Sequence, residues 1–168
     1  MLLDKNQVMN FLPHRDPFLF IDSLKEIILP EPLKYKKPPF HTNDMIGGKS
    51  ICTYKVEPSL KVLEGHFPGH PILPGVIQIE MMAQAASFLV IHCLEKPIEQ
   101  ARLDVQLLGV DSARFRKPIT PPMELEIHAT LNKVRGPIQI YECSLFSNGE
   151  LMSQTNILAS LKISYPQK

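Results

Sequence analysis

The chain has 168 residues, a length typical of one domain with a substantial buried core. Hydrophobic residues make up 44% of it and charged residues 21%, both close to the average of globular proteins. The net charge of +1 excludes a strong overall attraction to nucleic acid or to an anionic membrane. We therefore expect a single domain over residues 1–168 that binds neither.

The first third of the chain predicts short elements separated by prolines. The N-terminus contains an acidic residue and has no long apolar core, so it is not predicted to be a signal peptide. We expect a short helix over Lys5–Leu12 and a mostly buried strand over Phe18–Leu29. The segment Pro30–Phe40 contains four prolines and three lysines, which favours an exposed insertion with little to bury. Alternation of apolar and polar residues predicts a second strand over Lys49–Glu57.

The central part of the chain predicts one long helix. Residues Val76–Leu94 approach the roughly 20 apolar residues that span a bilayer. Four polar side chains interrupt this stretch, so we interpret it as a buried central helix. Four strand-like runs follow, separated by turn signals at Pro121-Pro122, Gly136-Pro137 and Asn148-Gly149. A long helix followed by antiparallel strands predicts an α+β fold in which the sheet wraps onto the helix.

The three cysteines, Cys52, Cys93 and Cys143, are odd in number and far apart in the sequence. Two of them lie in apolar strand or helix patterns. We interpret them as reduced, buried thiols of a cytoplasmic protein. No neighbouring cation lowers their pKa, so they are not predicted nucleophiles.

One carboxylate interrupts the predicted helix. On an ideal helix Glu80, Gln84 and Ser87 share one face. This polar stripe is either the solvent-exposed face or a polar site inside the protein, and the apolar residues on the other faces favour the second interpretation. Burial among apolar side chains would raise the pKa of Glu80. A carboxyl that stays neutral near pH 7 is suited to general acid catalysis.

The loop before this helix is rich in proline, glycine and histidine. His66 lies on a segment that Pro68 stiffens and glycines flank, although a turn cap is the simpler interpretation of an isolated histidine. A zinc site with His70 is not expected, because the intervening Pro68-Gly69 prevents helical alignment and no third ligand follows. A base of this kind next to a neutral acid is suited to removing a proton beside a carbonyl and expelling a hydroxyl as water.

The start of the predicted helix offers a site for negative charge. Pro74 favours a helix start, and Gly75 allows close approach to the first free N–H groups. Such groups stabilise a developing oxyanion, for example on a thioester oxygen.

The segment GHFPGHPILPGVIQIEMMAQA closely resembles the signature of bacterial (3R)-hydroxyacyl-[acyl-carrier-protein] dehydratases of the FabZ type, with histidine and acid fourteen residues apart. The resemblance extends to FLPHRDPFLFID (residues 11–22) and GVDSARFRKPITP (residues 109–121), and it covers nearly the whole chain. It implies a hot-dog fold, an antiparallel sheet wrapped around one long central helix. It also implies a homodimer, and a trimer of dimers, in which His66 of one subunit faces Glu80 of its partner across an acyl tunnel.

The resemblance further implies roles for particular residues, without a cofactor or metal. His66 would take the C2 proton and Glu80 would protonate the leaving hydroxyl, while the backbone at Gly75 and Val76 steadies the thioester oxygen. Related dehydratase-isomerases carry aspartate in place of Glu80, which argues for dehydration alone. Further substrate-binding candidates are Phe67, Pro74 and Gln84.

The implied partner is an acyl carrier protein whose phosphopantetheine carries a 3-hydroxyacyl chain, in type II fatty acid biosynthesis in the cytoplasm. Carrier proteins are acidic, so the basic run Arg114, Arg116 and Lys117 is a candidate docking site; the alternative is an ordinary solvated strand edge. The lysines of the insertion (Lys34, Lys36 and Lys37) either enlarge this patch or remain solvated.

Three departures from the family pattern leave acyl preference and assembly open: the insertion Pro30–Phe40, TPPM at residues 120–123, and Glu64 in place of the more usual glutamine. Three alternative functions remain. They are a hot-dog acyl thioesterase, a non-catalytic acyl-binding subunit, and a dehydratase of a polyketide or aryl polyene pathway. Retention of both His66 and Glu80 argues against the first two.

Overall fold

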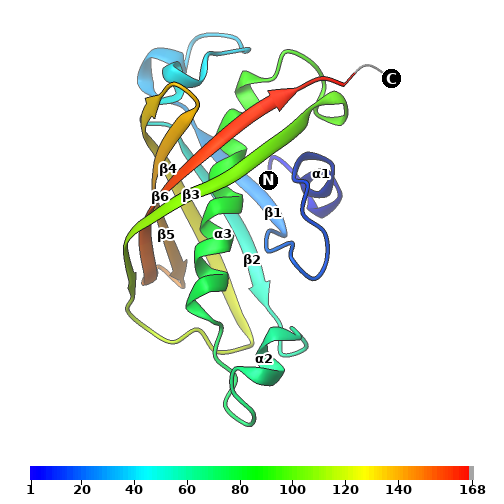
Figure 1. Cartoon of the computed structure of the whole chain (residues 1–168), viewed down its shortest axis with the longest axis vertical. Helices are drawn as coiled ribbons and strands as arrows, with labels where there is room; N and C mark the ends of the chain where they lie inside the picture. Colours follow the sequence, from blue (N-terminus) through cyan, green and yellow to red (C-terminus); the bar gives the residue numbers. More distant parts are fainter. Residues whose placement is uncertain (167–168) are drawn as a thin grey trace.

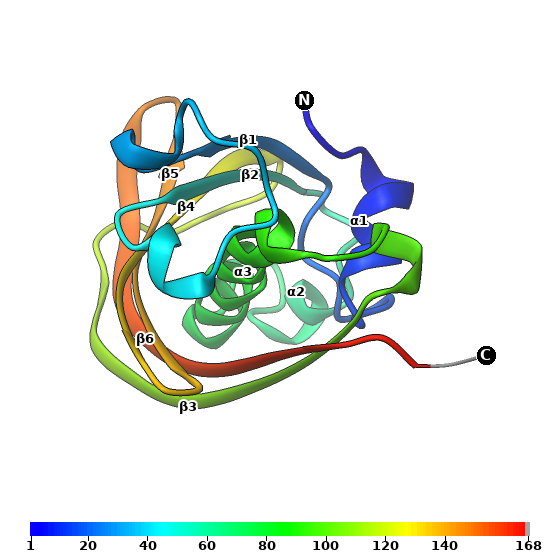
Figure 2. The same ribbon diagram turned by 90° about the horizontal axis from the view of Figure 1, so that it is seen from above.

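The computed structural model describes residues 1–166 and consists of a six-stranded antiparallel sheet curled around a central helix (Figures 1 and 2). The strand order is β1-β2-β4-β5-β6-β3. The predicted α+β architecture is therefore confirmed. The strands are β1 (Ser23–Ile28), β2 (Lys49–Val56), β3 (Arg102–Phe115), β4 (Met123–Arg135), β5 (Ile138–Ser147) and β6 (Glu150–Ser164).

Three α-helices accompany the sheet: α1 (Lys5–Phe11), α2 (Val62–Gly65) and α3 (Gly75–Ser87). The predicted central helix is α-helical only to Ser87 and continues as a 3-10 helix over Phe88–Cys93. Segment Gly75–Cys93 is long and apolar enough to cross a membrane by length and composition alone. Of its most apolar window, 61% is buried inside the fold, as expected of a core helix that a sheet surrounds.

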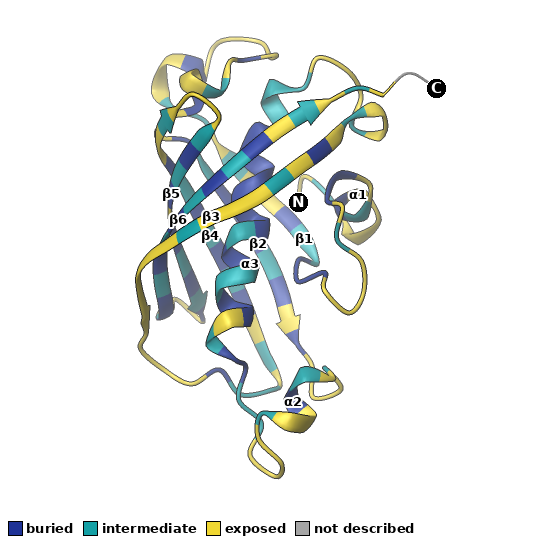
Figure 3. Ribbon diagram, viewed as in Figure 1, coloured by how far each residue is buried: buried dark blue, intermediate teal, exposed yellow. Residues whose placement is uncertain are grey.

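The core lies between α3 and the concave face of the sheet (Figure 3). Along β4, β5 and β6 buried residues alternate with more exposed ones, so each strand directs one face of its pleat toward the helix. The three thiols are free; Cys52 and Cys143 are buried in this core, whereas Cys93 is only half-buried. Burial raises the pKa of the Cys93 thiol to about 11.

The predicted strand Phe18–Leu29 is too long, since β1 begins only at Ser23. The three consecutive residues Leu19, Phe20 and Ile21 are all buried. A regular strand directs successive side chains to opposite faces and cannot bury three in a row against one helix. Instead, Phe20 N–H donates to Gln84 of α3 at 2.9 Å, so this segment packs along the helix.

The insertion Pro30–Phe40 lies at the surface of the molecule and is anchored to the fold. Tyr35 is 93% exposed, whereas Leu33 and Phe40 are buried, so the expectation that the segment has little to bury is wrong at these two positions. Phe40 N–H donates to His92 O at 2.9 Å. This contact ties the insertion to the C-terminal end of the central helix, opposite the loop that precedes α3 (Figure 1).

Candidate active site

His66 lies where α2 ends, in a loop that closes on itself. Its N–H donates to Leu63 O at 3.2 Å, and its carbonyl accepts from Ile72 N at 2.8 Å. The ring Nδ1 lies 2.8 Å from Ile72 O. Because a carbonyl only accepts, Nδ1 carries the hydrogen of the neutral ring, and Nε2 keeps its lone pair. The loop therefore presents His66 in the tautomer that acts as a base through Nε2.

One aromatic ring packs against this imidazole. Phe67 stacks on His66 with 4.1 Å between ring centroids, and the peptide bond between them is cis. Phe67 is half exposed, and Val76 on the first turn of α3 is 72% exposed. Exposed apolar side chains such as these two are typical of a binding surface.

The start of α3 carries free N–H groups and a tightly packed glycine. Pro74 is the N-cap, and no side chain caps the helix. In the described part of the chain the N–H groups of Gly75 and Val76 have no recorded acceptor, whereas the next two N–H groups donate to Pro74 O. A Cβ on Gly75 would lie 2.7 Å from Cζ of Phe115, closer than real side chains pack. Gly75 is therefore required for the approach of Phe115, which the sequence did not indicate.

Glu80 lies on the second turn of α3 and receives two hydrogen bonds on one oxygen. Its Oε1 accepts from Nε2 of Gln84 at 2.8 Å and lies 3.2 Å from Nε2 of His14. The carboxylate side chain is 21% exposed. Burial raises the pKa of Glu80. Hydrogen bonds from His14 and Gln84 and the charge of His14 together lower it by more than burial raises it, so the net pKa lies below the usual value. The predicted raised pKa is therefore wrong, because the sequence did not indicate that His14 folds onto Glu80.

Gln84 is 1% exposed and uses both ends of its amide within the chain. Its oxygen accepts from Phe20 N at 2.9 Å, and its nitrogen donates to Phe18 O at 2.8 Å as well as to Glu80. Gln84 therefore fastens the N-terminal segment to the carboxylate, and its contact with substrate stays a prediction. With Ser87 also buried, the stripe that begins at Glu80 is not the solvent face of α3.

The predicted base and acid are not paired within the chain. No hydrogen bond or ion pair between residues 1 and 166 joins His66 to Glu80. The His66 loop extends beyond the N-terminal end of α3 (Figure 1). Each group is supported by its own surroundings: His66 by its loop, and Glu80 by the N-terminal segment.

The predicted docking run lies next to this end of α3, because Phe115 contacts Gly75 and directly precedes Arg116. The guanidinium of Arg116 donates to Gln154 Oε1 at 3.2 and 3.3 Å, and Lys117 pairs with Glu150. Within residues 1–166, neither Arg114 nor Arg116 forms an ion pair, so these two side chains supply the positive charge of this strand end. His14 and Phe115 are the site residues that sequence reasoning missed; the family-like segment that contains His14 was the available signal.

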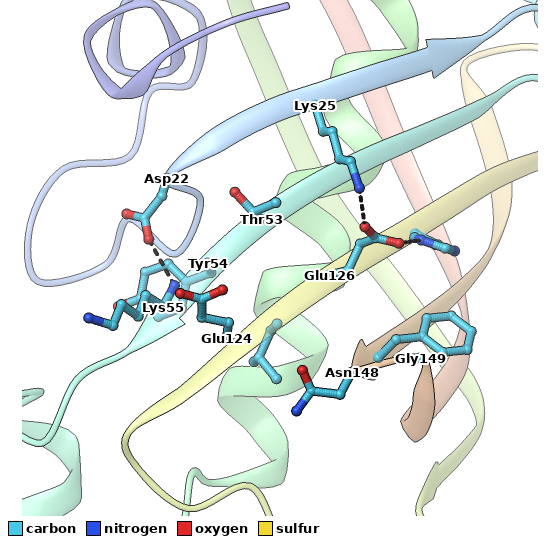
Figure 4. A pocket seen from close by; sticks show the side chains of 12 residues that line it. Asp22, Lys25, Thr53, Tyr54, Lys55, Glu124, Glu126, Asn148 and Gly149 are labelled. Carbon is cyan, nitrogen blue, oxygen red and sulfur yellow. Dashed lines mark hydrogen bonds and ion pairs between the residues drawn. The ribbon is translucent and has the colours of Figure 1, made fainter. Parts of the chain in front are cut away.

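A separate hollow of about 680 Å³ lies on the outer face of the sheet (Figure 4). In it Glu126 of β4 bonds to Lys25 at 2.7 Å and to His128 at 2.6 Å. Its lining includes none of the predicted site residues. Over the described range no group of three or more His, Cys, Asp or Glu side chains is arranged to hold a metal ion.

Comparison with known proteins gives concordant results. Residues 43–155 match the ApeI-like family, described as ApeI dehydratase. The chain is 36% identical over 163 residues to the 3-hydroxyacyl-[acyl-carrier-protein] dehydratase FabZ of a Nitratiruptor species, and the match covers 95% of this chain and 98% of that protein. The relationship therefore extends over both chains almost from end to end.

Solved structures share the fold. The dehydratase heterocomplex ApeI:P from Xenorhabdus doucetiae has a TM-score of 0.63 at 19% identity, covering 96% of this chain and 91% of that chain. A hypothetical thioesterase from Streptococcus pneumoniae, solved with coenzyme A, has a TM-score of 0.50 at 14% identity, covering 73% and 84% of the two chains. These likenesses confirm the hot-dog fold, which does not by itself decide between the two reactions.

Proposed function

Because this chain belongs to the ApeI-like family of dehydratases and is a homologue of the FabZ enzymes, we propose that it converts (3R)-3-hydroxyacyl-[acyl-carrier-protein] to the trans-2-enoyl form. The observation that carries the mechanism is the hydrogen bond from Nδ1 of His66 to Ile72 O, which leaves Nε2 free to accept a proton. The pathway is type II fatty acid biosynthesis in the cytoplasm.

In this reaction Nε2 of His66 takes the proton from C2 of the substrate. Negative charge develops on the thioester oxygen, and the free N–H groups of Gly75 and Val76 stabilise it at the positive end of the α3 dipole. The C3–O bond then breaks as Glu80 delivers a proton to the departing hydroxyl. The products are the trans-2-enoyl thioester and water.

A homodimer would bring the two groups together, and the edge strand supports this assembly. Among the described residues, strand β3 pairs with β6 alone, so its other edge is free within one protomer. Four apolar side chains on it are exposed: Leu107, Leu108, Val110 and Phe115. An apolar free edge favours pairing with a second copy. We propose that His66 of one protomer meets Glu80 of its partner there, and that three such dimers form the complete assembly.

The carrier protein would dock beside the start of α3. Arg114 and Arg116 lie at the end of β3, next to the contact between Phe115 and Gly75. An acidic carrier protein placed there would deliver its phosphopantetheine arm toward the free N–H groups of the helix. Lys117 contributes less, because Glu150 neutralises it.

A second candidate is a dehydratase of an aryl polyene or related secondary pathway. The match to the ApeI-like family gives this alternative weaker support than the FabZ relatives give the first candidate. The chemistry at His66 and Glu80 would be the same, and only the acyl chain would differ.

The test is to incubate the purified protein with 3-hydroxyacyl carrier proteins of graded chain length and to measure enoyl product by mass spectrometry. We expect water loss without release of free thiol. Thiol release without enoyl product would identify a thioesterase and contradict the proposal. Activity confined to conjugated polyene precursors would select the second candidate.

A further inference from the structure

His14 has one polar function in this structure. Its Nε2 lies 3.2 Å from Oε1 of Glu80. Its other ring nitrogen, Nδ1, is buried and has no hydrogen-bond partner within residues 1–166. The neighbouring Arg15 bonds only to backbone, donating to the carbonyls of Leu12 and His14. Within residues 1–166, the contact with Glu80 is therefore the one polar interaction of the His14 side chain.

Only one of the two carboxylate oxygens of Glu80 accepts hydrogen bonds from residues 1–166. Both donors, His14 and Gln84, bind Oε1, while Oε2 accepts no hydrogen bond from the described part of the chain. This arrangement fixes the plane of the carboxylate and leaves the second oxygen available to a substrate. The Gln84 amide does not exchange a proton with Glu80 at neutral pH, so His14 is the one neighbour able to supply it.

The same surroundings disfavour Glu80 as an acid by itself. His14 and Gln84 together lower its pKa, and His14 is the only titratable side chain among the groups that do so. An isolated carboxyl with a lowered pKa has lost its proton near pH 7. The proton that dehydration requires must then reside on another group that contacts the carboxylate.

We propose that His14 and Glu80 act as one proton-holding pair, in which His14 orients the carboxylate and supplies the proton that Glu80 delivers to the leaving hydroxyl. The proposal rests on the proposed dehydratase function. His14 is a positioning and proton-supplying residue that acts through Glu80 and does not itself contact the substrate.

The proton balance closes. Before the reaction His66 is neutral, Glu80 is ionised and His14 is protonated. The C2–H bond breaks and its proton moves to Nε2 of His66; the C3–O bond breaks, and the hydroxyl leaves as water with a proton from Glu80, which takes one from Nε2 of His14. Afterwards His66 is protonated, His14 is neutral and the net charge is unchanged. Solvent then returns one proton from His66 to the pair.

The test compares three variants in the hydration of crotonyl thioester, the reverse reaction, from about pH 5 to about pH 9. His14→Ala removes both the hydrogen-bond donor and the group that receives the proton in the hydration direction, whereas His14→Gln keeps a neutral donor. His128→Ala is the matched control, because His128 forms a similar pair with Glu126 at 2.6 Å on the outer face of the sheet. Circular dichroism establishes that each variant is folded.

We expect both His14 variants to lose at least about tenfold in kcat near pH 7.5, with a smaller change in KM, since lost acid–base help typically costs ~10²–10⁴-fold. Because hydration runs the proposed step in reverse, the Glu80–His14 pair accepts a proton from the attacking water, so the acidic limb of the variants' kcat profiles should move to lower pH. The ordinary pKa of a glutamate is about 4.3 and that of an imidazole is about 6.5. A lone carboxyl therefore loses its proton at lower pH than a pair that includes an imidazole. The control should retain the wild-type profile. If His14→Gln matched the wild type in rate and profile, or if kcat fell without a change in profile, proton supply by His14 would be disproved.

A second measurement is independent of activity. Carbon-13 NMR of the Glu80 carboxyl should show a higher pKa in His14→Ala than in the wild type, because a cause of the lowered pKa has been removed. An unchanged titration would overturn the pairing. If the wild-type protein hydrated no thioester while this shift was observed, the dehydratase function would fail and the His14–Glu80 pairing would stand.

Discussion

At the scale of single residues, the start of α3 is determined by contact as much as by hydrogen bonding. Gly75 lies against the ring of Phe115, and the first two N–H groups of the helix remain free beside that contact. The tip of Phe115 is the closest atom and the ring is half exposed, so it has room to swing away. A larger residue at position 75 would therefore displace the ring before it displaced the helix.

We predict that Gly75→Ala lowers the free energy of unfolding by about 1 kcal/mol, the lower end for overpacking, because the displaced atom is the end of a side chain. Phe115→Ala in the same chain should remove much of this cost. The measurement is a double-mutant cycle by urea unfolding at fixed protein concentration. Strictly additive costs would show that the two residues are not coupled.

Sequence reasoning proposed His66 and Glu80 as the two reacting side chains, but it did not predict the environment of Glu80. His66 and Glu80 stood out because a histidine-bearing rigid loop and a carboxylate in an apolar helix are both unusual. The sign of the Glu80 pKa shift depends on His14 and Gln84, which approach it only in the folded chain. Burial was predicted correctly as a cause that raises the pKa, and two hydrogen bonds outweigh it.

At the scale of elements, the strands after α3 were predictable because each carries a clear alternation and ends at a turn signal. The segment from Phe18 to Asp22 was not, because its apolar run fits a buried strand equally well. The insertion was recognised from its proline and lysine content. That composition gave no indication that two of its apolar residues are buried and anchor the segment to the fold. Leu33 and Phe40 are buried, while Tyr35 between them faces solvent.

We predict that the insertion contributes to stability through its two anchors. Leu33→Ala should cost about 2–5 kcal/mol and Phe40→Ala about 3–5 kcal/mol, the usual range for emptied core positions. Tyr35→Ala is the matched control and should change stability by less than about 0.5 kcal/mol, since its side chain is exposed. Chemical denaturation gives all three values, and equal effects at the three positions would contradict the anchoring.

The position of the insertion also determines whether its lysines can help to dock a carrier protein. Lys34 pairs with Glu31, and the segment lies at the opposite end of the helix from the His66 loop (Figure 1). Changing Lys34, Lys36 and Lys37 to alanine should therefore leave the ratio of activities on carrier-linked and small thioester substrates unchanged. A selective loss on the carrier-linked substrate that disappears with added salt would instead establish electrostatic docking there.

At the scale of the whole molecule, one edge of the sheet is protected and the other is open. The N-terminal residues Leu2 and Leu3 donate to Leu24 O and so cover the β1 edge. The β3 edge has no such cover and carries exposed apolar side chains. This asymmetry allows the sheet to extend in one direction only, which favours a closed dimer over an open filament.

We predict that inactive variants complement each other. His66→Ala and Glu80→Gln should each lose at least about 10²-fold in rate while remaining folded. After mixing and refolding, heterodimers should regain activity, because one of their two sites then has both an intact histidine and an intact carboxylate. Confirmed heterodimers without activity would show that each site lies within one protomer.

The hydrogen bonds that position Glu80 join two segments that leave the ribosome at different times during synthesis. The hydrogen bonds between Gln84 and the backbone of Phe18 and Phe20 join positions 66 and 64 residues apart. At about 5–20 residues per second, a ribosome needs roughly 3–13 s to make the intervening chain. Phe18 and Phe20 therefore emerge well before the helix they bind, and the carboxylate acquires its final partners only once that helix has followed them out.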